Sequence, residues 1–181
     1  MDVFFEQIIR KKPNTAQKII KIAFIIVAIV LIISLATYAF VWLTANSFLA
    51  PLCVLAAFGV GFGAHWYVKR MYLEYEYSIT NGDFDIDRII GKSKRERVIS
   101  TKCQDFEEFG VYDKTARERL SHREFNAKVI AANLDEEGLY YAVVTHKTAG
   151  TVLIVIEPDE RIKSALKKFV PRILQNDVFG R

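Results

Sequence analysis

The sequence predicts a two-helix transmembrane hairpin followed by a mainly β domain, a seven-stranded antiparallel barrel or sandwich with a C-terminal α-helix. Two observations predict this fold class. No Asp, Glu, Lys or Arg occurs between Lys21 and Lys69, which leaves 47 consecutive uncharged residues, and from Met71 onward apolar residues alternate with polar ones. The 181 residues are 51% hydrophobic. Their segregation excludes a fully soluble protein, a disordered chain and a disulfide-stapled small domain.

The uncharged stretch is long enough for two membrane crossings. Residues 22–43 would form roughly 33 Å of helix, enough for a hydrocarbon core of about 30 Å. Residues 48–68 supply a second apolar segment, and a short polar break of Thr44, Ala45, Asn46 and Ser47 separates the two. Pro51 suits the first turn of a new helix. We therefore predict transmembrane helices over residues 22–43 and 48–68.

Basic residues flank both segments and predict their orientation. The connection carries no charge, whereas the flanks contain Arg10, Lys11, Lys12, Lys18, Lys21, Lys69 and Arg70. Under the positive-inside rule, both termini are cytoplasmic and the protein is a multi-pass protein of the inner cell membrane. A cleaved signal peptide is the competing explanation, but the apolar run is too long and lacks a clear small-residue cleavage site.

The net charge of +4 belongs to these flanks. Residues 1–21 carry +3 and the Lys69–Arg70 pair carries +2, so residues 71–181 carry −1. A duplex-binding face needs Lys and Arg concentrated on the folded domain itself. Nucleic acid is therefore not a predicted partner.

Small residues in the second segment predict a helix-packing face. Gly59 and Gly63 form a GxxxG pair with Ala56 on the same side, so a neighbouring backbone can approach closely. Packing against the chain's own first helix and a homodimer contact both fit this pattern. His65 lies one turn from Lys69 and is interpreted as an interfacial residue rather than a proton relay.

Residues 1–21 are predicted to form a separate cytoplasmic or interfacial segment. Its apolar residues occupy one broad side of a short helix: Val3, Phe4, Phe5, Ile8 and Ile9. The sequence leaves open whether this segment lies along the inner membrane surface or packs on the cytoplasmic domain.

Residues 72–181 form one β-rich cytoplasmic domain in this interpretation. Apolar and polar residues alternate from Leu73 to Ile79, and Asn81-Gly82 is a strong hairpin signal before a second strand that includes Phe84 and Ile86. Five further strands are predicted at residues 97–101, 106–112, 125–131, 139–145 and 151–157. The charged stretch 113–124 is predicted to be irregular or briefly helical.

A helix is predicted after the last strand. Pro158, Asp159 and Glu160 are typical of a helix start, and apolar residues then recur at helical spacing: Ile162, Leu166, Phe169 and Ile173. Pro171 interrupts this pattern, so the helix is expected to kink or end near Val170.

The order of these elements is that of a pleckstrin-homology-like (PH-like) barrel. Residues 77–91 resemble the opening hairpin of bacterial PH-like domains found in small membrane proteins, and the whole chain is similar to one bacterial family of such proteins. The similarity rests on short motifs along the chain: Asp2-Val3-Phe4, Glu6-Gln7-Ile8, Thr80-Asn81-Gly82, Thr145-His146-Lys147 and Glu157-Pro158-Asp159-Glu160-Arg161. The resemblance implies a fold and a membrane location, and it transfers no ligand, reaction or functional residue.

One cluster of bases is a candidate lipid contact. By its resemblance to PH domains, the chain would be expected to bind a phosphoinositide headgroup through Lys and Arg on the loop between the first two strands. The loop assigned to this place, Thr80 to Asp83, is short and acidic. The bases lie one hairpin later, at Lys92, Lys94, Arg95 and Arg97. They predict either a solvated turn or contact with anionic lipids of the inner leaflet.

No pattern of catalytic or metal-binding residues emerges. Asp83, Asp85 and Asp87 would share one strand face, but they lack EF-hand spacing, so solvent exposure is predicted rather than a cation site. Cys53 and Cys103 are expected to be reduced thiols. We predict no catalytic residue, no cofactor and no metal site.

Two functions from different classes fit the sequence. The first is a non-enzymatic, membrane-anchored module whose PH-like domain binds a protein partner or lipid headgroups. The alternative is an accessory subunit of a larger membrane complex, such as a transporter or an envelope-assembly machine, that works through its hairpin.

Overall fold

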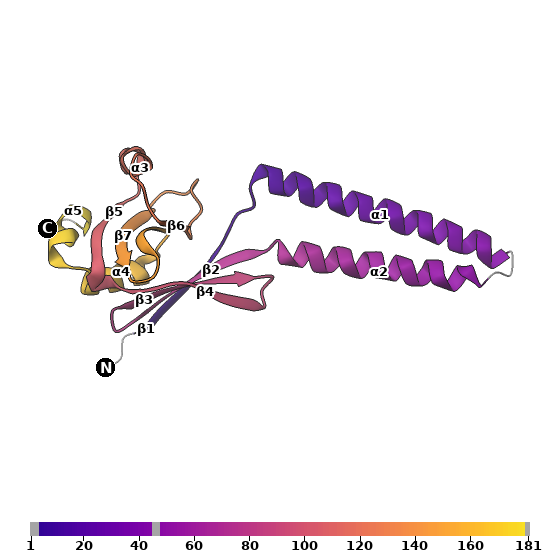
Figure 1. Ribbon diagram of the computed structural model, residues 1–181, viewed down its shortest axis with the longest axis horizontal. Coiled ribbons are helices and arrows are strands. Elements are labelled where there is room, and N and C mark those ends of the chain that lie inside the picture. Colours follow the sequence, from indigo (N-terminus) through magenta and orange to yellow (C-terminus); the bar gives the residue numbers. More distant parts are fainter. Residues whose placement is uncertain (1–3, 45–47, 180–181) are drawn as a thin grey trace. The chain divides into compact units, whose positions relative to one another are not determined.

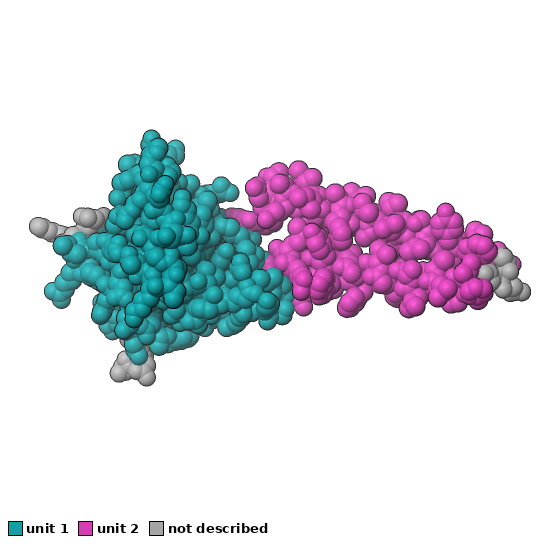
Figure 2. Space-filling model, viewed as in Figure 1, with its two compact units in different colours: residues 1–11, 73–181 teal, residues 12–72 magenta. Residues whose placement is uncertain are grey.

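The computed structural model describes residues 4–44 and 48–179. The chain forms two compact units: Met1–Lys11 together with Leu73–Arg181, and Lys12–Tyr72 (Figure 2). The second unit is thus inserted into the first, between two of its strands.

The inserted unit consists of helices α1 (Thr15–Thr44) and α2 (Leu49–Arg70) (Figure 1). Both are long and apolar enough to cross a membrane, judged by length and composition. α1 begins seven residues before the predicted residue 22, so Lys18 and Lys21 lie within its first turns. The residues 45–47 of the predicted connection lie outside the described part of the chain.

Local chemistry explains where α1 begins and how it can carry polar residues. The Asn14 side chain accepts a hydrogen bond from the Thr15 N–H (2.6 Å), and Gln17 reaches back to the Asn14 N–H (3.1 Å). Within the helix, the Ser34 and Thr37 hydroxyls donate to carbonyls one turn earlier, at 2.9 and 2.7 Å. These hydroxyls therefore need no water.

Sheet A contains four antiparallel strands in the order β1-β2-β3-β4. They are β1 (Phe4–Arg10), β2 (Leu73–Thr80), β3 (Asp83–Ile90) and β4 (Lys94–Lys102). Asn81 and Gly82 join β2 to β3 with φ values of 52° and 95°. Two left-handed residues are typical of the tight turn that the Asn-Gly pair predicts.

Strand β1 corrects the prediction of a short N-terminal helix. Residues 4–10 pair with β2 over their whole length, from Phe4 opposite Thr80 to Arg10 opposite Glu74. Phe5 and Ile9 pack against the core while Phe4 and Ile8 are exposed, which is the period of a strand. The sequence left open whether this segment lies on the membrane surface or packs on the domain, and residues 4–10 pack on the domain.

Sheet B has the order β5-β7-β8-β6. Its strands are β5 (Phe106–Val111), β6 (Ala127–Ile130), β7 (Tyr140–His146) and β8 (Gly150–Ile156), and a short 3-10 turn, Cys103–Asp105, leads into β5. The seven predicted strands are confirmed as β2–β8. The expectation that all are antiparallel is wrong for β6, which pairs in parallel with β8. The chain runs from β6 to β8 through β7, which is antiparallel to β8.

The two sheets and a C-terminal helix enclose the main core. Tyr77, Ile79 and Phe84 of sheet A are fully buried with Val144 and Ile154 of sheet B. A second apolar cluster packs sheet B against α3 (Lys114–Ser121), which occupies part of the charged stretch 113–124.

The predicted C-terminal helix is confirmed as α4 (Glu160–Phe169). Asp159 caps it by accepting from the Ile162 N–H at 2.8 Å, and Ile162 and Leu166 are fully buried. Pro171 ends it as expected, and a second helix, α5 (Arg172–Phe179), follows.

Candidate functional site

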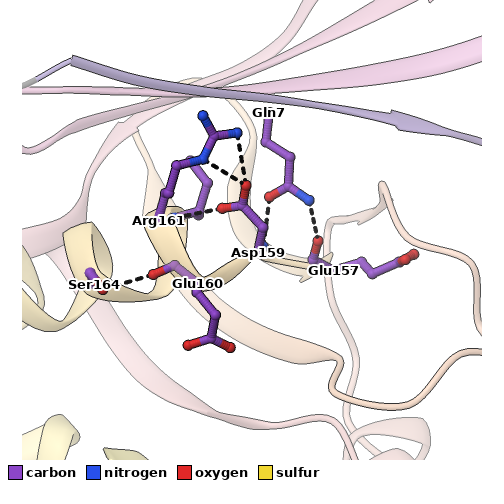
Figure 3. Close-up of polar contacts among 7 residues, drawn as sticks. Gln7, Glu157, Asp159, Glu160, Arg161 and Ser164 are labelled. Atoms are coloured by element: carbon purple, nitrogen blue, oxygen red, sulfur yellow. Dashed lines mark hydrogen bonds and ion pairs between the residues drawn. The ribbon is translucent and has the colours of Figure 1, made fainter.

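The seam where β1 joins the rest of the domain is held by side chains from distant parts of the chain. The Gln7 amide donates to the Glu157 carbonyl (2.9 Å) and its oxygen accepts from the Asp159 N–H (2.8 Å) (Figure 3). Gln7 therefore connects β1 to the segment that leads from β8 into α4. The sequence does not predict this role, because the apolar residues from Val3 to Ile9 suggest one side of a short helix.

Where β1 ends, a second polar cluster fixes its last residue. The Asn133 side-chain amide donates to the Arg10 carbonyl (3.1 Å) and also to the Glu157 carboxylate (3.3 Å). The Arg10 guanidinium forms an ion pair with Glu74 on β2 (3.0 Å). Isolated Asn and Glu residues give no sequence signal for such a cluster.

Lys11 turns its side chain toward main-chain carbonyls. Its Nζ donates to Ala132 (2.5 Å) and Ile130 (3.5 Å), while its main-chain N–H donates to Leu73 (2.9 Å). Burial lowers the pKa of the Lys11 ammonium, and the carboxylates of Glu157 and Asp135 oppose that shift. Lys11, one of the bases that flank the hairpin, therefore stabilises the fold of the domain through these hydrogen bonds.

An open cavity of ≈ 520 Å³ adjoins this seam. Its lining combines apolar and charged side chains from β1, β2 and the segments after β6 and β8: Ile8, Ile9, Arg10, Glu74, Asn133 and Glu157. It is open and has a mixed polar and apolar lining, unlike the largely apolar and enclosed pockets that are typical of small-molecule sites.

The predicted lipid-contact bases are engaged in ion pairs on their own sheet. Arg95 binds Glu76 (3.0 Å), Arg97 binds Asp85 (2.8 Å) and Asp87, and Lys94 binds Glu96 (2.6 Å). Hydrogen bonds from Lys94 and Arg88 lower the pKa of Glu96 to about 2. Lys92 lies in the β3–β4 turn with a positive φ of 59°. Three of the four predicted bases, Lys94, Arg95 and Arg97, are therefore paired with carboxylates of their own sheet.

The three aspartates of β3 share a face, but two of them depart from the expected exposure. The side chains of Asp85 and Asp87 are 24% and 19% exposed because the Arg97 guanidinium lies against both, whereas Asp83 is exposed. Within residues 4–44 and 48–179, no group of His, Cys, Asp and Glu is arranged to hold a metal ion.

The two cysteines lie in different units and are both free thiols. Burial raises the pKa of Cys103 to about 12, so this thiol is an inert core residue.

The GxxxG pair of α2 does not face α1. A Cβ atom added to Gly59 or Gly63 would meet no described atom within 4 Å, whereas one added to Gly61 would meet the Ile32 side chain at 3.8 Å. The interpretation that Gly59 and Gly63 pack on the chain's own first helix is therefore wrong. Ala56 is likewise exposed, and the face formed by Ala56, Gly59 and Gly63 stays a predicted contact for another helix.

Comparison with known families agrees with this architecture. A family model described as a bacterial PH-like domain (DUF6106) matches residues 1–176. The chain belongs to this family of bacterial PH-like domains. No curated protein and no solved structure matches the chain significantly.

Within this PH-like protein, β1 changes which connection joins the first two strands of the sheet. The first two strands of the sheet are β1 and β2, so the assignment of that connection to residues 80–83 is wrong. The connection between β1 and β2 is residues 11–72, which is the helical hairpin itself. Its flanks carry the bases Lys11, Lys12, Lys18, Lys21, Lys69 and Arg70.

Proposed function

We propose that this protein is a non-enzymatic interaction module anchored in the inner membrane, which holds a protein partner at the cytoplasmic face. The insertion of the hairpin between two paired strands is the observation that carries this proposal. Because β1 precedes α1 and β2 follows α2, their pairing requires both ends of the hairpin to lie on the same side of a membrane. Two crossings with both termini cytoplasmic meet that requirement and agree with the basic flanks.

This attachment restricts the domain to the membrane surface. Only residues 11–14 separate β1 from α1, and residues 71–72 separate α2 from β2. Two short connections confine the domain more than one flexible linker would, and they raise the local concentration of any membrane-associated partner.

A protein partner is favoured over lipid headgroups by the ion pairs of sheet A. A base near an anionic membrane surface contributes about 1 kcal/mol when its charge is available. Arg95 and Arg97 instead compensate carboxylates that are 8%, 24% and 19% exposed, namely Glu76, Asp85 and Asp87. Headgroup binding through this turn would first have to break those pairs.

Site-specific photo-crosslinking in the full chain, expressed in its native membrane, tests the proposal. A photoreactive residue would replace Val98, Val111 or Leu134, three exposed apolar residues of the domain. We expect a discrete protein adduct from at least one position, and the same protein should copurify with the unmodified chain in mild detergent. Adducts with lipid alone would favour headgroup binding, and the absence of any adduct would contradict the interaction module.

An accessory-subunit function is the second candidate, and the outward direction of Gly59 and Gly63 favours it. A Cβ atom added at Gly59 or Gly63 would have no described neighbour within 4 Å, and Phe58 and Phe62 beside these glycines are exposed. A helix of another membrane protein could approach it closely. Crosslinks that arise from α2 and not from the domain would support this candidate over the first.

A further inference from the structure

The outer edge of β1 is an open sheet edge, and the register shows which backbone groups face it. The Lys11 N–H donates to the Leu73 carbonyl at 2.9 Å, so odd-numbered residues of β1 direct their N–H and C=O groups to β2. Even-numbered residues direct theirs away from the sheet. The bond from the Asn133 side chain to the Arg10 carbonyl, at 3.1 Å, agrees with this parity.

Three residues of this edge offer backbone groups to an added strand. Phe4, Glu6 and Ile8 have no described backbone or side-chain partner for their outward N–H and C=O groups in residues 4–44 and 48–179. Phe4 and Ile8 are also 61% and 48% exposed. Pro and β-bulges often protect exposed sheet edges, and β1 contains neither.

Charge beside this edge favours a cationic occupant. Glu76, paired with Ile8 across the sheet, is 7% exposed; its Oε1 accepts from Arg95, whereas its Oε2 is buried without a hydrogen-bond partner among the described residues. Burial raises the pKa of Glu76, Arg95 opposes the shift, and the charges of Glu6 and Asp87, together with a side-chain hydrogen bond to Glu6, raise it further. A cation at this point would supply the missing donor.

We propose that an extended peptide segment of the protein partner adds to sheet A along β1, with apolar residues at alternate positions and a Lys or Arg that reaches Glu76. The backbone of Phe4, Glu6 and Ile8 would supply affinity, and the exposed apolar side chains would select the residues opposite them. The cavity beside Ile8 and Arg10 would receive the end of the segment. This inference rests on the proposed interaction module and names the form of its partner.

The parity of β1 allows a test in the full chain embedded in lipid nanodiscs. The probe is a phage-displayed library of random peptides, selected on the protein and depleted on empty nanodiscs. Glu6→Pro removes an N–H that faces outward and leaves the β1–β2 hydrogen bonds in place, whereas Glu6→Ala keeps that N–H and is the matched control. Deuterium uptake by residues 4–10 of the unmodified protein is a second readout that needs no variant.

Selected peptides should share alternating apolar residues and a Lys or Arg. Their binding should slow deuterium uptake by β1 and not by β4. The affinity of the Glu6→Pro variant for these peptides should be about tenfold lower than that of the Glu6→Ala variant. The inference is overturned if no peptide is enriched, if Glu6→Pro and Glu6→Ala bind equally, or if a second copy of the chain protects β1. Peptides that protect another surface would refute the β1 site and leave the proposed interaction module intact. The absence of any protein adduct in the photo-crosslinking experiment would refute the interaction module itself.

Discussion

The main-chain N–H of Lys11 donates to the carbonyl of Leu73 over 2.9 Å, although residues 12–72 intervene along the chain. In the antiparallel register these two residues follow directly on the pair Arg10 and Glu74. The hairpin thus occupies the position that a tight turn would take between β1 and β2. The PH-like domain is consequently discontinuous in sequence.

Replacement of residues 12–72 by Asn-Gly should therefore yield a folded domain in water. A two-residue Asn-Gly turn matches the twist of paired strands, and it would join Lys11 to Leu73 without a change of register. We expect a cooperative unfolding transition and β-rich circular dichroism from this shortened chain.

Further removal of residues 1–11 is the matched control. It exposes β2 and removes both Gln7 hydrogen bonds together with the burial of Phe5 and Ile9. The loss should be about 3–5 kcal/mol in the free energy of unfolding, enough to unfold a marginal domain. Equal stability with and without residues 1–11 would show that β1 is dispensable.

Arg97 is expected to stabilise the domain through its two aspartates. Because its side chain is 51% exposed, Arg97→Gln should lower the free energy of unfolding by only about 1 kcal/mol. Lys147→Gln, in an exposed turn, is the control and should stay within about 0.5 kcal/mol of the parent. Denaturant titrations of the shortened chain at low and high salt would measure both, and the Arg97 effect should shrink with salt. Equal free energies of unfolding for the two variants at low salt would contradict a stabilising contribution from Arg97.

The glycines of α2 should separate packing within the hairpin from contact with a neighbour. Gly61→Leu places atoms against Ile32 and should destabilise the hairpin by about 1–3 kcal/mol. Gly59→Leu extends into open space and should leave the hairpin unchanged while weakening any association through that face. Denaturation in detergent measures the first effect and copurification of partners the second. Equal destabilisation by both substitutions would contradict the outward direction of Gly59.

Glu76 should make the domain less stable as the pH rises. Its folded-state pKa is raised, so the folded protein binds the Glu76 proton more tightly than the unfolded chain does. The penalty is absent below the ordinary Glu value of about 4.5 and grows as the pH rises through the folded-state value. Glu76→Gln should therefore gain stability relative to the parent on going from pH 4 to pH 7, by less than about 1 kcal/mol because the charge of Arg95 opposes the shift. A constant difference across that range would show that Glu76 has an ordinary pKa.

Most of the fold could be predicted from local patterns. The alternation in β2 and β3, the Asn81-Gly82 turn and the cap at Asp159 are encoded within a few residues of each element. Strand β1 could not be assigned this way. Its apolar residues suit both a helix and a strand, and its partner β2 follows only after the whole hairpin.

The candidate surfaces were harder to predict, because their chemistry depends on pairing across strands. Lys94, Arg95 and Arg97 look like a basic cluster in sequence, but the carboxylate that neutralises Arg95 comes from Glu76 on another strand. The direction of Gly59 depends on how α2 packs against α1, which the GxxxG spacing does not specify. Because β1 was not predicted, residues 80–83 were assigned to the connection between the first two strands, although they lie between the second and third.

Thiol labelling from the two sides of the membrane tests the central claim, a membrane hairpin inserted between two strands of one cytoplasmic domain. Single cysteines would replace Glu6 on β1, Phe48 between the helices and Lys147 in the turn between β7 and β8, in a chain with Cys53→Ala. An impermeant maleimide should label Glu6→Cys and Lys147→Cys only in inside-out vesicles and Phe48→Cys only in intact cells. Labelling of Glu6→Cys and Lys147→Cys from opposite sides of the membrane would contradict the account.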